Sequence, residues 1–342
     1  MTTRLSTIFN QAILGADVEL NNVALDSRRI QQGDLFLAFA GDAVDGQQYI
    51  AQAVANGAVA VAVENAAYVG EFPVSYVQVN QLRWQAGHIA SRFYGEPSKS
   101  LRVMGVTGTN GKTSITHYIE QLLAACGNEC AVIGTLGLRY DQQQFATQNT
   151  TPDAVTLQKH LREIHDKRVP YVAMEVSSHA LVQGRCNGIR FEGAIFSNVS
   201  HDHLDYHKTL DDYFAAKAAL FSAEGLRWAV LNADDQRYAE LRRYIADDVR
   251  VISYSRENAV ADVHLTDISY QEGVYQAKLN VQGASFAIKT QLQGAFNLSN
   301  LLASVAVMQA LDADMAKVAK SLIHILPVAG RMQTVANNKA IN

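Results

Sequence analysis

The chain has 342 residues, of which 48% are hydrophobic and 18% are charged. This length is enough for two or three domains, and this composition excludes a disordered protein. The net charge of −4 gives no general attraction to nucleic acid, so an anionic substrate must be bound by local basic residues and backbone amides.

The sequence contains no apolar stretch of signal-peptide type at its start and no run long enough to span a membrane. Its three cysteines, Cys126, Cys130 and Cys186, lack the spacing of zinc ligands. We therefore expect a cytoplasmic protein with free thiols that binds neither membranes nor nucleic acid.

Residues 1–98 predict a small N-terminal α/β domain. Its expected elements, in chain order, are a helix at 5–14, a strand at 35–41, a helix at 47–56, strands at 58–64 and 75–79, and a helix ending near 94. The segment GEPSKS (95–100) has the composition of a linker.

Residues 99–332 predict a larger central domain. Apolar strands are expected at 101–106, 130–134, 170–176, 193–199, 228–233 and 249–255, and helices at 113–126, 154–167, 209–222, 236–246, 297–311 and 314–325. Such alternation indicates a mainly parallel sheet with helices on both faces. The polar/apolar alternation of 262–294 predicts a small antiparallel addition.

A glycine-rich loop, GVTGTNGKTS (105–114), follows the first of these strands and opens a helix. Its spacing is Gly-x2-Gly-x2-Gly-Lys-Thr, because Val106 occupies the place of the first glycine of the usual phosphate loop. Backbone amides and the helix N-terminus would hold phosphates, while Lys112 would reach the β- and γ-phosphates and Thr113 would ligate Mg²⁺. We predict ATP or GTP binding by Gly108, Thr109, Asn110, Gly111, Lys112, Thr113 and Ser114.

A second group of candidate residues follows later strands. Glu175 ends a strand, where a carboxylate commonly serves a metal. The segment NVSHDHLDYH brings together His201, His203 and His207, which fits a metal or phosphate site. A loop of solvated histidines is the alternative, and it is the first interpretation for His201 and His207.

Lys217 is the least expected residue of its predicted helix, because it falls on the apolar face beside Tyr213 and Phe214. Such a lysine either extends its ammonium to solvent or is kept for chemistry. The residues alone favour the first interpretation.

Several separated motifs, in this order, resemble the Mur ligases of peptidoglycan synthesis. They are the glycine loop, EVSSHALVQGR (175–185), DHLDYHKTLDDYFAAKAALF (202–221) and LQGAFNLSNLLAS (292–304). LDSRRIQQGDLFLAFAG (25–41), DGQQYIAQAVANGA (45–58) and NTTPDAVTLQ (149–158) are similar to the MurE type, which adds a diamino acid to UDP-N-acetylmuramoyl-L-alanyl-D-glutamate. The resemblance runs from about Val23 to Arg331.

The resemblance implies roles for residues that the chemistry alone leaves open. Lys217 would be carbamylated by CO₂, which reverses the interpretation above, and would act in catalysis with Lys112 and His203. Thr113, Glu175, His203 and Lys217 would hold metal, with two Mg²⁺ ions in all. Asn297 would approach the adenine, and Arg331 the ribose or phosphates. The UDP-substrate would meet Leu25, Ser27, Asn149, Thr150, Thr151, Ser177, Gln183 and Arg185. Asp42 stands where relatives often have histidine, which puts the uridine contact there in doubt.

The implied enzyme is an ADP-forming acid–amino-acid ligase that acts on small molecules: ATP, UDP-N-acetylmuramoyl-dipeptide and a diamino acid. We expect a monomer that adds meso-diaminopimelate, with lysine as the alternative. The family's third domain carries an Asp-Asn-Pro-Arg motif that this sequence lacks, so we expect a fragment with little activity alone, in which 333–342 begins that domain. A kinase, a transport ATPase or a nucleotide-binding module without ligase chemistry remains the alternative class.

Overall fold

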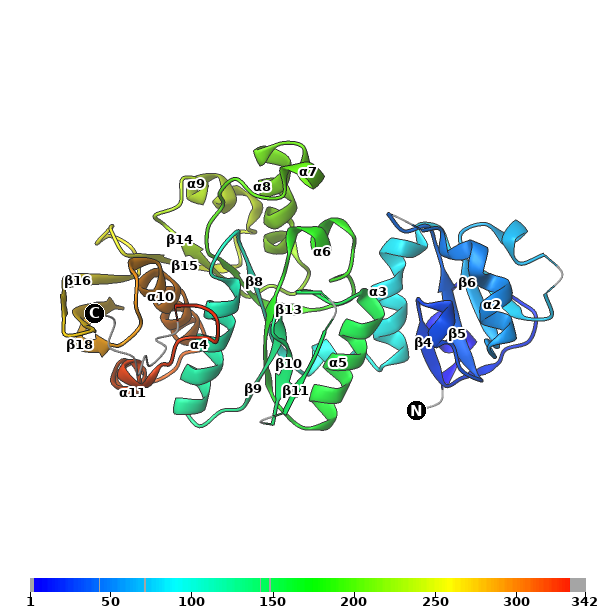
Figure 1. Cartoon of the computed structure of the whole chain (residues 1–342), viewed down its shortest axis with the longest axis horizontal. Helices are drawn as coiled ribbons and strands as arrows, with labels where there is room; N and C mark the ends of the chain where they lie inside the picture. The colour runs from blue at the N-terminus through cyan, green and yellow to red at the C-terminus, as the bar shows by residue number, and fades with distance from the viewer. Residues whose placement is uncertain (1–2, 43, 71, 142, 148, 333–342) are drawn as a thin grey trace, which may run out of the picture. The chain divides into compact units, whose positions relative to one another are not determined.

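The computed structural model describes residues 3–332 except 43, 71, 142 and 148. The chain divides into two compact units that alternate along the sequence (Figure 1). The first comprises Met1–Leu101, Thr151–Arg168 and His179–Ile189, and the second comprises Arg102–Thr150, Val169–Ser178 and Arg190–Asn342. The domain boundaries at 98 and 332 stay predictions, and the proposed start of a third domain at 333–342 lies outside the described residues.

The first unit is built on a five-stranded sheet with the order β2-β7-β6-β5-β4. Its strands are β2 (Ile13–Leu14), β4 (Asn22–Ala24), β5 (Asp34–Ala38), β6 (Ala60–Val63) and β7 (Ser75–Gln78), and β1 (Thr3–Arg4) pairs separately with β3 (Glu19–Leu20). Its helices are α1 (Leu5–Ile8), α2 (Ile50–Ala55), α3 (Leu82–Phe93) and α5 (Ala154–Asp166). Apolar residues of α3 and α5 share one buried cluster with the sheet.

The helix predicted at 5–14 is wrong over its second half. Helix α1 ends at Ile8, Phe9 is extended, and Ile13 pairs with Val77 as part of an antiparallel strand pair. Tertiary pairing thus overrides the local helical pattern.

The second unit contains an eleven-stranded sheet with the order β11-β10-β9-β12-β8-β13-β14-β15-β16-β17-β18. The parallel strands that form its centre are β8 (Arg102–Thr107), β9 (Cys130–Gly134), β12 (Tyr171–Glu175), β13 (Phe191–Phe196), β14 (Trp228–Asn232) and β15 (Arg250–Ser255). β16 (Val263–Gln271), β17 (Val274–Val281) and β18 (Ala284–Thr290) form the predicted antiparallel addition. The hairpin of β10 (Gly137–Tyr140) and β11 (Gln143–Phe145) was not predicted.

Helices cover both faces of this sheet, as predicted. On one face, Met104 and Val106 of β8 share a buried cluster with α4 (Lys112–Ala125) and α10 (Ala295–Ala310). On the other face, a side chain at Gly105 would meet Leu220, which follows helix α8. The remaining helices of the second unit are α7 (Leu204–His207), α8 (Leu210–Ala218), α9 (Tyr238–Leu241) and α11 (Met315–Ser321). Helix α6 (Ser178–Val182) belongs to the first unit except for Ser178. No helix among the described residues is long and apolar enough to cross a membrane.

Candidate active site

The candidate site lies where parallel strands of the second unit end. β12, β8 and β13 are neighbours, so their carboxyl ends meet at one edge of the sheet. β8 leads into the glycine loop, β12 ends at Glu175, and Ser197 and Asn198 follow β13. Strand order therefore brings together segments that are far apart in the sequence.

The glycine loop is fixed by hydrogen bonds to Asn198, which follows strand β13. Gly108 and Gly111 have φ angles of 145° and 91°, in the region that favours glycine. The Asn198 carbonyl accepts a hydrogen bond from the Thr109 amide at 2.7 Å, and its side-chain oxygen accepts one from the Asn110 amide at 3.0 Å. These bonds fix the loop before helix α4 begins.

Lys112 folds back over the loop that precedes it. Its Nζ donates to the carbonyls of Gly108 at 2.8 Å and Thr109 at 3.0 Å. Burial lowers the pKa of Lys112, while the charges of Glu175 and Asp202 act in the opposite direction. The loop, the lysine and the start of α4 thus have the arrangement of a phosphate-binding loop.

Glu175 is 1% exposed and lies beside the first turn of α4. Its Oε2 accepts hydrogen bonds from the hydroxyls of Thr113 and Thr135, each at 3.1 Å, and its Oε1 accepts one from the Thr135 amide at 2.8 Å. Burial raises the pKa of the Glu175 carboxyl, and these hydrogen bonds and the charge of Lys112 oppose that rise. Thr135 was missed from the sequence, although it directly follows β9, the neighbour of β12.

Lys217 does not reach solvent, so the interpretation based on the residues alone is wrong. The side chain is 1% exposed, and its Nζ donates to the Gly108 carbonyl at 2.9 Å. The Nζ also lies 4.1 Å from the centre of the Tyr213 ring. Burial and then the charge of Lys112 lower the pKa of Lys217 to about 6, against the opposing charge of Asp202.

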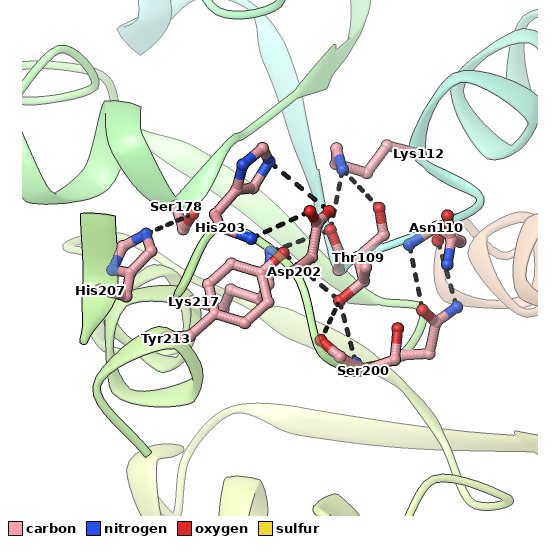
Figure 2. A network of polar contacts seen from close by, with 12 residues as sticks. Thr109, Asn110, Lys112, Ser178, Ser200, Asp202, His203, His207, Tyr213 and Lys217 are labelled. Carbon is pink, nitrogen blue, oxygen red and sulfur yellow. Dashed lines mark hydrogen bonds and ion pairs between the residues drawn. The ribbon is translucent and has the colours of Figure 1, made fainter. Parts of the chain in front are cut away.

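The three histidines have different environments, and Figure 2 shows the contacts of His203 and His207. His201 is exposed, and the side chain of His203 is 49% exposed with its Nε2 3.6 Å from Asp202 Oδ2. His207 is buried, and its Nε2 lies 2.9 Å from the Ser178 hydroxyl. Solvation is therefore the wrong interpretation for His207, which ties α7 to the start of α6.

The predicted metal ligands belong to this region but do not form a closed cage. Across the described stretches of the chain, no three His, Cys, Asp or Glu side chains are grouped so that they could hold a metal ion. Thr113 and Glu175 offer the oxygen atoms that Mg²⁺ prefers. Lys217 fits such a site only as a carbamate, because an ammonium has no lone pair to donate.

A cavity of about 810 Å³ extends from the glycine loop along the second unit. This volume is within the range of small-molecule sites. Besides the loop, its wall includes Thr135, Thr150, Glu175, Ser197, Asn198, Asp234, Tyr254, Arg256, Glu257, Phe296, Ser299, Asn300, Arg331 and Met332.

The two residues expected at the nucleoside end differ in position. Arg331 lies on the cavity wall. Asn297 is buried, and its amide is bonded to Tyr118, Asn300 and the Gln293 carbonyl. Asn300, which donates to the Asn297 side chain, lines the cavity instead. The two asparagines are three residues apart on one helix, so the sequence does not reveal which of them faces the cavity.

Several residues expected to contact the UDP-substrate lie in the first unit. Ser27 is buried and donates to Gln52 at 2.7 Å, while the neighbouring Leu25 is half-buried. Gln183 donates to Asp42 at 2.7 Å, and Arg83 pairs with the other oxygen of Asp42 at 2.6 Å.

Arg185 donates to the carbonyl of buried Thr151 at 2.9 Å. The pKa of Asp42 is lowered first by its hydrogen bond to Arg83 and, as the last of the contributions, by the charge of Arg185. Three further expected residues lie in the second unit. The Thr150 hydroxyl is 3.1 Å from that of Thr135, Asn149 is exposed, and Ser177 is half-buried just after β12.

Comparison with known proteins identifies two matching family models. The Mur ligase middle domain matches residues 106–308, and the Mur ligase family catalytic domain matches residues 19–94. The chain is 42% identical over 328 residues to the UDP-N-acetylmuramoyl-L-alanyl-D-glutamate–2,6-diaminopimelate ligase of Ectopseudomonas mendocina, covering 95% of this chain and 67% of the relative. It is 39% identical to the enzyme of the same name from Pseudomonas aeruginosa, over 97% of this chain and 68% of the relative.

Solved structures show the same likeness. A structure of a UDP-N-acetylmuramoyl-L-alanyl-D-glutamate–2,6-diaminopimelate ligase has a TM-score of 0.88 at 31% identity, over 99% of this chain and 70% of the other. The Thermotoga maritima MurF ligase in complex with ADP has a TM-score of 0.66 at 22% identity, over 93% of this chain and 69% of the other. At this identity the comparison shows a shared fold. The chain thus spans about two thirds of the length of these proteins.

Proposed function

Because this chain belongs to the Mur ligase family, we propose that it performs the ATP-dependent step of an acid–amino-acid ligase acting on UDP-N-acetylmuramoyl-L-alanyl-D-glutamate. The amino acid added would be meso-2,6-diaminopimelate. The named relatives support diaminopimelate over lysine, since each is a 2,6-diaminopimelate ligase. We place the enzyme in the cytoplasm as a monomer.

One observation carries the proposal: a buried lysine and a buried carboxylate meet a phosphate-type loop at one sheet edge. Lys217 and Lys112 both donate to the Gly108 carbonyl, and Glu175 accepts from Thr113 at the start of α4. A kinase or transport ATPase needs the loop and a carboxylate, but it has no need of the second, buried amine. The arrangement favours chemistry in which an acid and a triphosphate are brought together.

The reaction would begin with attack of the substrate carboxylate on the γ-phosphorus of ATP, which breaks the bond to the β-phosphate oxygen and releases ADP. Loop amides and Lys112 would hold and neutralise the phosphates during this in-line transfer. The amine of the diamino acid would then attack the acyl phosphate carbonyl, losing a proton and expelling phosphate as the amide forms. The substrate carboxylate must be activated because direct attack by the amine would have to expel one of its oxygen atoms as oxide, which is too poor a leaving group.

Two Mg²⁺ ions would supply charge neutralisation between carboxylate and triphosphate. Thr113 would hold one ion with the nucleotide, and Glu175, His203 and carbamylated Lys217 would hold the other. The carbamate would form when the neutral Nζ of Lys217 bonds to the carbon of CO₂ and loses a proton, leaving a carboxylate-like anion. The depressed pKa of Lys217, about 6, supports this step because the free amine is the reacting form.

The remaining roles follow from position. Arg331 and the exposed ring of Phe296 would contact the nucleoside, and Asn297 would act there by holding Asn300. Gln183 and Arg185 would bind the substrate after exchanging their present partners Asp42 and Thr151.

The proposal is tested by calorimetric titration of the chain with ATP plus Mg²⁺ and, separately, with UDP-N-acetylmuramoyl-L-alanyl-D-glutamate. Both should bind, and Lys112→Met should weaken ATP binding at least about 10-fold while leaving the UDP-substrate unaffected. ATP binding without any binding of the UDP-substrate would leave only a nucleotide-binding module and contradict the proposal.

A further inference from the structure

A second cavity of about 440 Å³ lies in the second unit, and none of its lining residues belongs to the glycine loop. It is bounded by α4, by strands β9, β10 and β11 at one end of the sheet and by the segment 326–329 that follows α11. That segment is tied to α4 by two hydrogen bonds between the Gln121 side chain and the Leu326 backbone, at 2.8 and 3.1 Å. The volume is at the small end of the range for ligand sites.

An arginine with unused donors stands on one wall of this second cavity. Of the five N–H donors of Arg139, only one is hydrogen bonded among the described residues, to the Glu120 carboxylate. Its Nε is buried without a partner, yet the side chain as a whole is 38% exposed. A guanidinium in this state can still donate hydrogen bonds to a carboxylate from its other terminal nitrogen.

His117 of helix α4 also lines this cavity and offers a hydrogen-bond acceptor. His117 Nδ1 lies 2.8 Å from the Thr113 carbonyl, and because a carbonyl only accepts, Nδ1 must carry the proton. Nε2 is then an acceptor, and no described residue donates to it. Burial and, to a smaller extent, the charge of Arg139 lower the pKa of His117, while the hydrogen bond to the Thr113 carbonyl opposes that change.

The rest of the second cavity is mainly apolar. Its wall includes Val132, Leu136, Leu326, Pro327 and Val328. The site therefore combines a donor for a carboxylate, an acceptor for an N–H group and an aliphatic surface. Glu120 beside Arg139 disfavours a plain anion, whereas a zwitterion adds no net charge.

We propose that this second cavity binds a small aliphatic α-amino acid. The carboxylate lies on Arg139, the ammonium donates to His117 Nε2, and the side chain packs on Leu136, Leu326 and Val328. This site is separate from the residues assigned to ATP and to the UDP-substrate.

L-Leucine serves as the probe, and titration calorimetry of the full chain is the measurement. L-Leucine should bind, and L-leucinamide, which lacks the carboxylate, and 4-methylpentanoate, which lacks the amine, should each bind at least about 10-fold more weakly. Equal binding of all three, or no binding of L-leucine, would overturn the proposal. ATP takes no part in this assay, so its outcome is independent of the ligase proposal.

Arg139→Gln should weaken L-leucine binding by about 10-fold or more. Arg102→Gln is the matched control, because Arg102 is equally exposed at 38% and pairs with Glu192 outside this cavity. If Arg139→Gln fails to fold, Leu326→Ala serves as the second variant. The Leu326 side chain is 63% exposed, so its truncation should leave the core intact. Because this side chain would contact the ligand, its loss should weaken L-leucine binding about 5-fold. Unchanged affinity in either variant would contradict the assignment.

Discussion

Lys217 is a buried lysine whose ionisation opposes folding. Its pKa falls from 10.5 to about 6 on folding. Between these values the unfolded chain binds a proton that the folded chain does not, so this residue destabilises the fold progressively as pH falls from 10.5 towards 6. A residue under this penalty is expected to have a function that compensates for it.

Lys217→Met should therefore stabilise the protein. In CO₂-free buffer near neutral pH, the free energy of unfolding should rise by about 3 kcal/mol. Removing the buried amine contributes about 4 to 5 kcal/mol, and losing the hydrogen bond to the Gly108 carbonyl offsets about 1 to 2 kcal/mol of this. The gain should shrink as pH rises. Urea unfolding at neutral and alkaline pH measures both effects. Lys278→Met, at an exposed ion pair with Asp267, should show no such gain. A less stable Lys217→Met variant would contradict the assigned burial cost.

Glu175→Gln tests the carboxylate without changing the size of the side chain. Because burial already raises the pKa of Glu175, removing the charge should change the free energy of unfolding by less than about 1 kcal/mol. The stimulation of ATP binding by Mg²⁺ should fall about 10-fold or more, since an amide is a poor magnesium ligand. ATP titrations with and without Mg²⁺ provide the measurement, and undiminished stimulation would remove Glu175 from the metal site.

At the scale of elements, the central strands were predicted because each is a short, nearly continuous apolar run. The strand at 130–134 agrees with β9 residue for residue. The β10–β11 hairpin was missed because its residues, GLRY and QQF, carry little apolar alternation. The helix at 236–246 is shorter than expected, with α9 ending at Leu241 in a 3₁₀ turn.

The site was predictable where local sequence context defines it. The loop residues and Glu175 follow from strand–loop–helix order and from a carboxylate at a strand end. Thr135 and Asn198 depend on which strands are neighbours, which one sequence does not state. The burial of Lys217 and His207 depends on the side chains brought over them by other elements, so their solvated interpretations were wrong.

Gly111→Ala tests the loop as an element. Gly111 has a φ of 91°, and an added Cβ would lie 2.4 Å from the Asn300 side-chain oxygen. Gly127, at the other end of α4, has a φ of 85° with nothing within 4 Å, so Gly127→Ala carries the backbone strain alone. Gly127→Ala should cost about 1 kcal/mol of stability and bind ATP normally, whereas Gly111→Ala should also lose ATP affinity about 10-fold or more. Thermal unfolding and ATP titration separate the two effects, and equal ATP affinity in both variants would contradict the role of this loop.

At the scale of the whole molecule, the two units are each assembled from separated stretches of chain. The hydrogen bond from Gln183 to Asp42 joins residues far apart in sequence within the first unit. Composition shifts alone favour a single boundary near residue 98, because they do not reveal that 151–168 and 179–189 return to the first unit.

Nucleotide binding should be visible in the stability of the molecule. A ligand that binds only the folded state at about 100 times its Kd adds about 2.7 kcal/mol. MgATP should therefore raise the thermal midpoint of the wild-type chain, and the Lys112→Met chain should show a much smaller rise. Equal shifts in both chains would mean that the nucleotide binds elsewhere.

The central claim is that the glycine loop, Glu175 and Lys217 form one site for ATP-driven activation of an acid. The most direct measurement is a crystal structure of the chain with a non-hydrolysable ATP analogue, Mg²⁺ and bicarbonate. We predict phosphate oxygens on the amides of residues 108–113, metal density against Thr113 and Glu175, and the additional density of a carbamate on Lys217. A nucleotide bound away from this loop, or metal that contacts neither Glu175 nor Lys217, would contradict the account.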